Sequence, residues 1–291
     1  MKPSVHIILV QWNGGSETAS CLSSLEKLAY ENRKVVVVDN GSTDDSVGSI
    51  RQRFPWANII LTGQNLGFSG GCNAGMRRAL AEGADYVWLL NNDAIADPGA
   101  LDALVNKAET DPRIGAVGSA IYSMEEPTQL QAWGGGYVNF WMGHARHFLK
   151  PVSDEKIQYI TGASLLIRRR VLETVGLMDD AIFLYWEDPD YCWRLRQAGW
   201  RLAVAGESKI WHKGMSASRK NPKLDVFYNA SAVRFFMQHS PTPLLSLSVG
   251  SFLRIAKRLM AADWKRARAI WVGVNQGAVE NLVGRGPGRD S

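Results

Sequence analysis

Four residues of this sequence are of types that carry out chemistry, and they follow or adjoin apolar runs: Asp39, Asp93, Asp188 and His212. Asp93 comes directly after two amides, Asn91 and Asn92. A carboxylate with neutral oxygen donors can bind a hard cation such as Mg²⁺ or Mn²⁺ when a diphosphate supplies further ligands. The alternative is an Asx turn ahead of Asp97, which would cap the next helix.

Asp188 is a candidate general base. It stands between Glu187 and Asp190 in a stretch rich in tyrosine and tryptophan. Carboxylates crowded together near aromatic rings have raised pKa values, and a raised pKa suits a general base. Because Pro189 follows, Asp188 could equally cap a helix that has proline at its first position.

His212 and Asp39 each allow two interpretations. His212, beside Lys213, could complete a metal site or contact an anion, although a lone histidine is more often a structural residue. Asp39 could accept a hydrogen bond from a nucleobase or a ribose, or it could close an Asx turn. The glycines at 67–75 do not form the G-x-G-x-x-G pattern of dinucleotide-binding proteins, but they would let backbone approach a ligand closely.

Short apolar runs alternate with helix-like segments over the first 120 residues and would position these side chains. The runs are Val5–Gln11, Lys34–Asp39, Asn58–Leu61, Tyr86–Asn91 and Ile114–Ile121. This alternation predicts an α/β fold with a mainly parallel, Rossmann-like sheet flanked by helices. Ligands of such sheets bind beyond the carboxyl ends of the strands. Because four successive ends carry polar turns, we expect them to form one site.

The composition is that of an ordinary globular protein. The chain has 291 residues, of which 46% are hydrophobic and 21% charged, and this excludes a mainly disordered protein. Three scattered cysteines without a C-x-x-C pair indicate a reducing compartment and no structural zinc. We recognise no secretory leader and no apolar run of about 20 residues, so we expect a cytoplasmic protein without a spanning helix.

The positive charge is concentrated at the C-terminal end. Residues 241–291 hold eight Lys or Arg and three Asp or Glu, which leaves residues 1–240 with 25 of each sign. A neutral body argues against nucleic-acid binding. From Leu244 to Trp271, apolar residues at helical spacing with interspersed basic residues predict an amphipathic helical extension at an anionic membrane surface, or alternatively a helix packed on the body. We therefore divide the chain into a body, 1–240, and a tail, 241–291.

The motifs follow one another in a recognisable order: Asp39-Asn40-Gly41-Ser42, Asn65-Leu66-Gly67-Phe68-Ser69-Gly70-Gly71, Asn91-Asn92-Asp93, Thr161-Gly162-Ala163, Gly176-Leu177-Met178-Asp179, Glu187-Asp188 and His212. Over roughly residues 5–215, this order resembles glycosyltransferase family 2, in particular its bacterial rhamnosyltransferase-like branch. The resemblance implies a GT-A fold, a nucleotide-diphospho-sugar donor, Mg²⁺ or Mn²⁺ as cofactor, and inversion at the anomeric carbon. Residues 1–240 would then be the catalytic domain.

The resemblance also implies roles for single residues. Asp188 would be the general base, and Asp93 and His212 would bind the metal ion. The residues implied to contact the donor are Trp12, Asp39, Asn65, Gly67, Gly71, Asn73, Asn92 and Asp93. The acceptor would contact Gly162, Trp186 and Glu187. The chain departs from the family pattern at Gln11, at Asn91, where the first aspartate of the DxD-type motif usually stands, and in residues 227–232, which lack an Arg-Asn pair.

We therefore expect an inverting, metal-dependent enzyme that transfers a sugar from a dTDP- or UDP-linked donor to a glycan or polyprenyl-linked glycan. The best-supported sugar is L-rhamnose from dTDP-rhamnose, and the process would be cell-surface polysaccharide synthesis. Such a protein would be peripheral on the inner face of the cell membrane. A sugar nucleotidyltransferase is less well supported, because residues 13–17 lack the basic residues that bind a triphosphate. A non-catalytic protein that binds sugar nucleotides or a partner is favoured by Asn91 and by the altered residues 227–232, whereas Asp93, Asp188 and His212 together argue against it.

Overall fold

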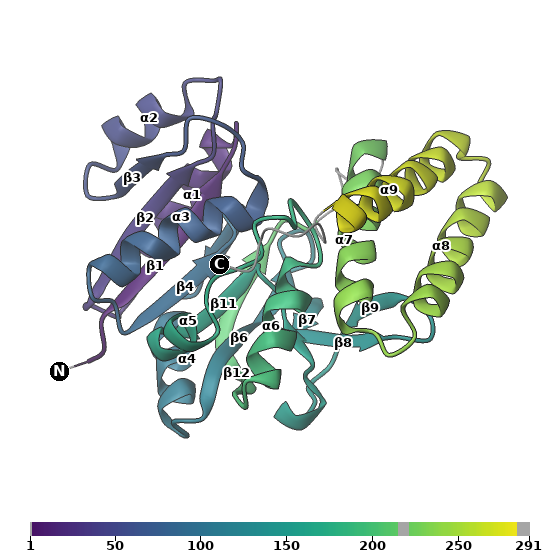
Figure 1. Cartoon of the computed structure of the whole chain (residues 1–291). Coiled ribbons are helices and arrows are strands. Elements are labelled where there is room, and N and C mark those ends of the chain that lie inside the picture. The colour runs from purple at the N-terminus through teal and green to yellow at the C-terminus, as the bar shows by residue number, and fades with distance from the viewer. Residues whose placement is uncertain (1, 215–220, 284–291) are drawn as a thin grey trace. The chain divides into compact units, whose positions relative to one another are not determined.

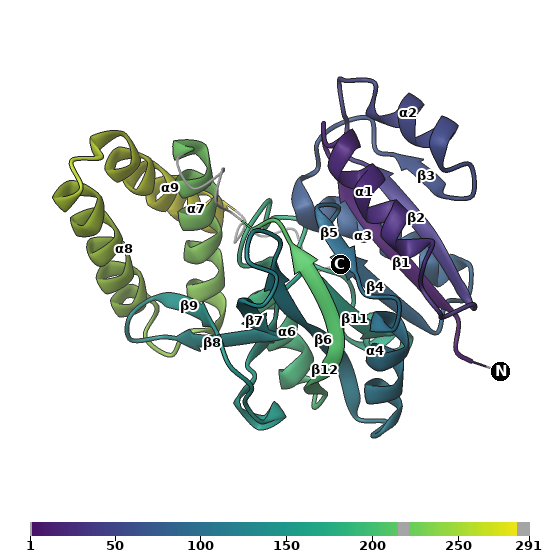
Figure 2. The ribbon, with the colours of Figure 1, turned by 180° about the vertical axis from the view of Figure 1, so that it is seen from behind.

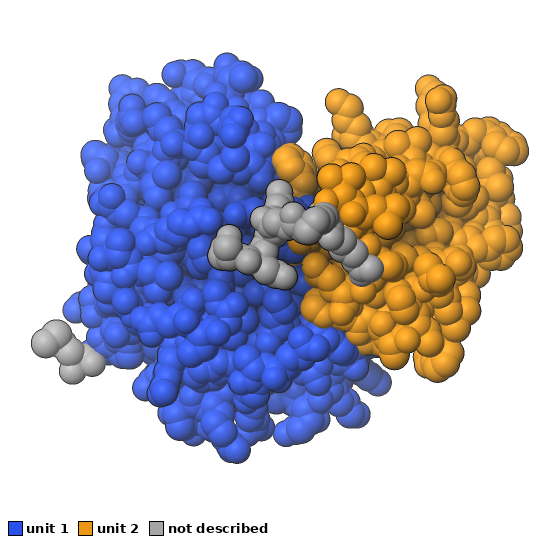
Figure 3. Space-filling view, viewed as in Figure 1, with its two compact units in different colours: residues 1–137, 146–181, 188–214 blue, residues 138–145, 182–187, 215–291 orange. Residues whose placement is uncertain are grey.

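The computed structural model describes residues 2–214 and 221–283. The chain forms two compact units (Figure 3). Unit 1 contains residues 1–137, 146–181 and 188–214, and unit 2 contains residues 138–145, 182–187 and 215–291. The border between these units does not coincide with the expected border between residues 240 and 241. The division into a catalytic body and a membrane-associated tail stays a prediction about function.

Unit 1 is built around one large sheet (Figures 1 and 2). The strands are β1 (Val5–Gln11), β2 (Arg33–Asp39), β3 (Asn58–Leu61), β4 (Tyr86–Leu90), β5 (Ala94–Ala96), β6 (Ile114–Ser123), β7 (Leu130–Trp133), β8 (Gly135–Asn139), β9 (His144–His147), β10 (Tyr159–Ile160), β11 (Ser164–Arg168) and β12 (Arg201–His212). Their order is β10-β8-β7-β6-β11-β4-β1-β2-β3, and β12 pairs with β5 and β6. The hairpin β8–β9 continues into unit 2.

The first four strands form the parallel half of this sheet. β1 pairs in parallel with β2 and β4, and β2 pairs in parallel with β3, so Gln11 and Asp39 lie side by side at the carboxyl edge. β11 runs antiparallel between β4 and β6. β12 runs parallel to β6, and its last residue, His212, pairs with Ala94 on β5. This pairing places the end of β12, far along the chain, at the sheet edge where β4 ends.

Helices cover both faces of the sheet. The helices of unit 1 are α1 (Gly15–Leu25), α2 (Ser46–Arg53), α3 (Gly67–Ala81), α4 (Ala100–Glu109), the short 3₁₀-helix η1 (Asp154–Lys156), α5 (Arg169–Thr174) and α6 (Glu187–Gln197), whose first residue is assigned to unit 2. α3 lies on the face opposite α1 and α4 (Figures 1 and 2). Alternate residues of β1 therefore serve two layers: Ile7 enters the core with α1 and α4, whereas Ile8 meets α3.

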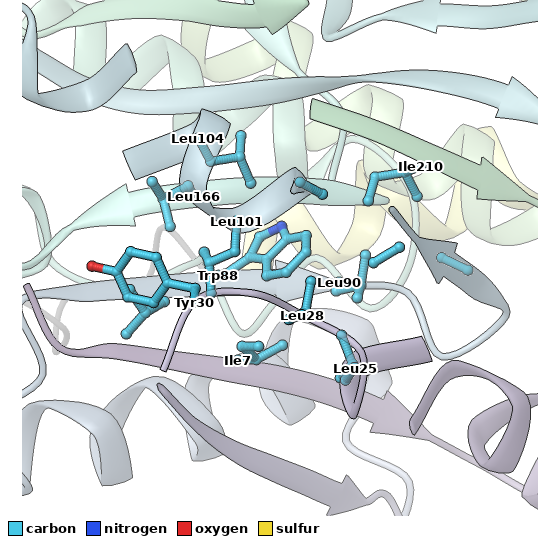
Figure 4. Close-up of a cluster of buried hydrophobic side chains, with 14 of the residues drawn as sticks. Ile7, Leu25, Leu28, Tyr30, Trp88, Leu90, Leu101, Leu104, Leu166 and Ile210 are labelled. Atoms are coloured by element: carbon cyan, nitrogen blue, oxygen red, sulfur yellow. The ribbon is translucent and has the colours of Figure 1, made fainter. Parts of the chain in front are cut away.

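The main core fills the space between the sheet, α1 and α4 (Figure 4). Trp88 lies at its centre, fully buried, with its indole N–H donated to Ser164 Oγ at 2.9 Å. Leu25 and Leu101 reach it from the two helices. The packing fixes the ends of β1 and β4, and these ends carry the polar residues of interest.

Unit 2 contains three long helices, α7 (Pro222–His239), α8 (Pro243–Met260) and α9 (Trp264–Val283). Asn221 caps α7 by accepting a hydrogen bond from Lys223 N, with Pro222 at the start of the helix. α7 packs against both α8 and α9. Among the described residues, we find no helix that is both long and apolar enough to cross a membrane.

Candidate active site

A pocket of about 360 Å³ opens in unit 1 beyond the carboxyl ends of β1 and β4. Its lining comes from the end of β1, from the turns after β1 and β4, and from the first turns of α1 and α3: Val10, Trp12, Asn13, Gly14, Glu17, Phe68, Asn91, Asn92 and Asp93. The structure thus brings the predicted residues Trp12, Asn92 and Asp93 into one cavity. Trp12 is 56% exposed, so its ring is available to stack on a flat ligand.

Asp93 and His212 lie together although they are far apart in the sequence. Asp93 Oδ1 is 3.1 Å from His212 Nε2, and Asn91 Nδ2 is also 3.1 Å from this nitrogen. The backbone N–H of Lys213 donates to the carbonyl of Asp93 and fixes the end of β12 here. One carboxylate and one imidazole fit Mg²⁺ or Mn²⁺ as a partial ligand set that leaves positions for ligand oxygens. No third His, Cys, Asp or Glu of the described residues completes a metal cluster.

Asp39 is buried next to this pocket with both carboxylate oxygens engaged. Gln11 Nε2 donates to Oδ1 at 3.0 Å, and Ser42 N donates to Oδ2 at 3.2 Å. Gln11, a departure from the family pattern, therefore orients Asp39. The Ser42 contact is the Asx-type turn that the sequence allowed as an alternative role.

The predicted residues in α3 and just before it mainly make contacts within the protein. Asn65 Oδ1 accepts from Gly67 N at 2.9 Å, where Gly67 has φ +75°. A Cβ on Gly71 would come within 2.6 Å of Val10 Cγ1, so this glycine permits close packing of α3 on β1. Asn73 is fully buried and bonds both backbone groups of Met178 at 2.9 and 3.0 Å. These residues shape the loop and helix behind the pocket and do not line it.

Sequence reasoning missed an ion pair at the rim of the pocket. Lys213 Nζ lies 3.1 Å from Glu17 Oε1, across 196 residues of sequence. Hydrogen bonds from the Ser16 hydroxyl and the Lys213 ammonium lower the pKa of Glu17 to about 2. In the sequence, this pair could have been suspected only from the position of Glu17 in the first turn of a helix and of Lys213 directly after His212. An ammonium group here could contact an anionic ligand.

Asp188 lies in the first turn of α6, and the residue as a whole is half-buried. Burial raises its pKa to about 6, although hydrogen bonds from Gly162 N, at 3.0 Å, and from the Thr161 hydroxyl oppose the rise. Phe68 links this carboxyl group to the pocket. It lines the pocket, and its ring is 3.2 Å from where a Cβ on Gly162 would lie. A carboxyl group with this pKa is ionised near neutral pH and basic enough to accept a proton.

Two of the residues predicted to contact the acceptor, Trp186 and Glu187, belong to unit 2 and are buried. Trp186 is 3% exposed and packs on Phe235 and Phe236, with ring centroids 4.9 and 5.0 Å apart. Tyr185 and Trp186 have φ values of 65° and 68°, which is unusual for aromatic residues. In this structure Trp186 therefore anchors the segment before Asp188. Gly162, the third predicted acceptor residue, holds Asp188 itself.

Comparison with known proteins supports this description. The family model described as "Glycosyl transferase family 2" matches residues 6–176, which include Asp39 and Asp93. The N-acetylglucosaminyl-diphospho-decaprenol L-rhamnosyltransferase of Mycobacterium tuberculosis is 28% identical over 292 aligned positions, covering 90% of this chain and 94% of the relative. Galactofuranosyltransferase GlfT1 of the same species is 28% identical, covering 73% of this chain and 71% of the relative.

Two solved structures have a similar fold. The mannosyltransferase PcManGT from Pyrobaculum calidifontis, in complex with GDP-Man and Mn²⁺, superposes with a TM-score of 0.61 at 16% identity and covers 98% of this chain and 88% of that one. GalNAc-T7 with UDP, GalNAc and Mn²⁺ gives a TM-score of 0.67 at 14% identity, over 98% and 58%. This chain therefore has the GT-A fold and belongs to glycosyl transferase family 2.

Proposed function

We propose that this glycosyltransferase moves L-rhamnose from dTDP-rhamnose to a hydroxyl group of a lipid-linked glycan, with inversion and with a divalent cation. The observation that carries the proposal is the pocket beyond β1 and β4, which holds Asp93 with His212 3.1 Å away. In an open α/β sheet this edge is where nucleotides bind.

The residues of the pocket are suited to a nucleoside diphosphate. Trp12 would stack on the base. Asp39, held by Gln11, would accept a hydrogen bond from the base or the ribose. Asp93 and His212 would hold the cation, which would stabilise the charge that develops on the leaving diphosphate. Lys213 would add a second positive charge once it leaves Glu17.

Asp188 would act as the general base. It would accept the proton of the acceptor hydroxyl as that oxygen forms a bond to the anomeric carbon and the bond from this carbon to the diphosphate breaks. Attack opposite the leaving group inverts the anomeric centre once. The N–H of Gly162 would keep the carboxylate oriented during the transfer.

Rhamnose and the lipid-linked acceptor are suggested by the mycobacterial rhamnosyltransferase, whose similarity extends over 90% of this chain. The basic C-terminal tail agrees with an acceptor held in an anionic membrane surface.

A transfer assay tests the proposal. The full chain with Mn²⁺ would be given dTDP-rhamnose, UDP-galactose or GDP-mannose and a synthetic polyprenyl-diphosphate N-acetylglucosamine, and the product would be analysed for sugar and anomeric configuration. We expect rhamnosyl transfer with inversion from dTDP-rhamnose only. Transfer from another donor would overturn the choice of sugar, and retention would overturn the role of Asp188.

A further inference from the structure

Helix α8 is built with its polar side inward. Ser246 is fully buried, and Gly250 and Arg254 follow it at intervals of four residues. Arg254 donates to the carbonyl of Gly143 at 2.8 Å and to Asn229 Oδ1 at 2.9 Å. A Cβ on Gly250 would come within 2.7 Å of the Gly143 carbonyl oxygen, so α8 packs closely on this turn of unit 2. Hydrogen bonds and close backbone contact hold the helix in place.

The opposite side of α8 is apolar and exposed. We define the α8 outer face as Leu245, Val249, Phe252, Ala256, Leu259 and Met260, which follow helical spacing. Phe252 is 69% exposed, Leu245 43% and Met260 83%. A surface helix of a globular protein normally turns such a stripe toward the core. The reversed arrangement indicates an apolar environment outside the helix.

Helix α9 has the same reversed build. Gly273 and Gly277 lie against α7, where a Cβ on either would come within 2.6 Å of a backbone carbonyl oxygen. Trp264 and Trp271 point outward and are 69% and 62% exposed. A shallow hollow of about 540 Å³ lies on this outer side, lined by Trp271, Val272, Asn275, Gln276, Val279 and Glu280. Small residues inside and tryptophans outside are typical of helices at a lipid interface.

We infer that unit 2 docks on an anionic lipid surface by inserting the α8 outer face. This inference specifies which surface would contact the proposed membrane partner. It rests on the proposed function, since a lipid-linked acceptor would lie in the same membrane surface. α8 has 18 residues and basic side chains at its end, so it would lie in the plane of the interface.

The charges around the α8 outer face favour lipid over a second copy of the chain. No acidic residue occurs from Val226 to Ala262. Lys257, Lys265 and Arg268 are exposed, and none forms an ion pair with another described residue. Two copies meeting through the same face would bring these like charges together. Anionic headgroups would instead pair with them while the apolar side chains enter the acyl boundary.

Co-sedimentation of the full chain with phosphatidylcholine vesicles, with and without phosphatidylglycerol, tests this inference. We expect binding that phosphatidylglycerol strengthens. Phe252→Asp or Met260→Asp should each lower the partition coefficient at least about tenfold (~1.4 kcal/mol), because each removes an apolar side chain from the lipid. Leu149→Asp is the matched control, because Leu149 is 67% exposed in unit 1, and it should bind as the wild type does.

Two outcomes would overturn the inference. One is vesicle binding that neither α8 substitution weakens. The other is a wild type that ignores vesicles and forms a dimer by light scattering, with the dimer lost in Phe252→Asp, because a second copy would then cover the face. The increase in melting temperature caused by the donor nucleotide, measured on the same variants, distinguishes failure of the lipid-docking inference from failure of the proposed function. The outer face is outside the donor pocket, so these variants should keep that stabilisation.

Discussion

Replacing Asp188 with asparagine should remove activity and stabilise the fold at the same time. The amide would keep the size of the side chain, and its oxygen could still accept the hydrogen bond that Gly162 N gives to Asp188 Oδ2 at 3.0 Å. It cannot accept a proton from the acceptor. Loss of a general base typically costs about 10²–10⁴-fold in rate, so we expect kcat to fall within that range.

The stability change follows from the raised pKa of Asp188. Burial moves it from 3.8 to about 6, which corresponds to roughly 3 kcal/mol of stability that the fold loses by holding this carboxylate ionised. The folded state binds the proton more tightly than the unfolded chain, so the cost is absent below about pH 4, grows as pH rises, and is complete above about pH 6. Asp188→Asn should therefore be more stable than wild type by up to about 3 kcal/mol at pH 8 and equal to it at pH 4.

Nucleoside diphosphate release and thermal melts at the two pH values measure both effects. The wild-type rate should rise with pH and reach half of its maximum near pH 6. Asp190→Asn is a useful contrast, because Asp190 is buried in an ion pair with Arg194 at 2.9 Å and its loss should destabilise the protein. An Asp188→Asn variant that turns over at the wild-type rate, or that melts earlier at pH 8, would refute the reasoning.

Three further predictions concern the pocket and its support. Lys213→Met should raise the donor KM about tenfold by removing a charged contact to the diphosphate, whereas Lys209→Met, at an exposed position of β12, should not. An unchanged KM in steady-state kinetics would argue against the contact. Trp12→Ala should weaken nucleoside diphosphate binding about tenfold in calorimetry, with the exposed Trp56→Ala as control, and equal affinities would exclude stacking. Gly75→Ala should cost about 1–3 kcal/mol in denaturant unfolding, since its Cβ would lie 2.5 Å from Ile8 Cγ2, and a gain in stability would contradict the packing.

Much of the sheet edge was predictable because apolar runs and polar turns are local signals. The structure confirms the expected runs β1 and β3 residue for residue. Farther along the chain, β10 and β11 are separated by the turn that holds Gly162, because residues 161–163 leave the sheet and Gly162 N donates to Asp188. The grouping of Trp12 with Asp93 follows from parallel pairing of neighbouring strands, which the alternation of runs and helices indicates.

The rest depends on contacts between distant residues. The motif around Asn73 predicts an amide that binds the donor, but the side chain hydrogen-bonds to Met178, 105 residues away. Nothing in the sequence near Asn73 indicates this contact. The contact of Lys213 with Glu17 is hidden for the same reason. In α8 the spacing of the apolar stripe was visible. Its outward direction was not, because spacing alone does not tell which side of a helix meets the protein.

Donor binding measured by thermal shift tests the central claim most directly, namely that the pocket at Asp93 and His212 binds a nucleotide sugar with a divalent cation. A panel of dTDP-rhamnose, UDP-sugars and GDP-sugars would be tested with and without Mn²⁺ on wild type, Asp93→Ala and Glu126→Ala, an exposed control. A ligand that binds only the folded state raises its stability by mass action. We predict a Mn²⁺-dependent shift for dTDP-rhamnose that Glu126→Ala keeps and Asp93→Ala loses. A donor shift that persists in Asp93→Ala, or no shift with any nucleotide sugar, would contradict the account.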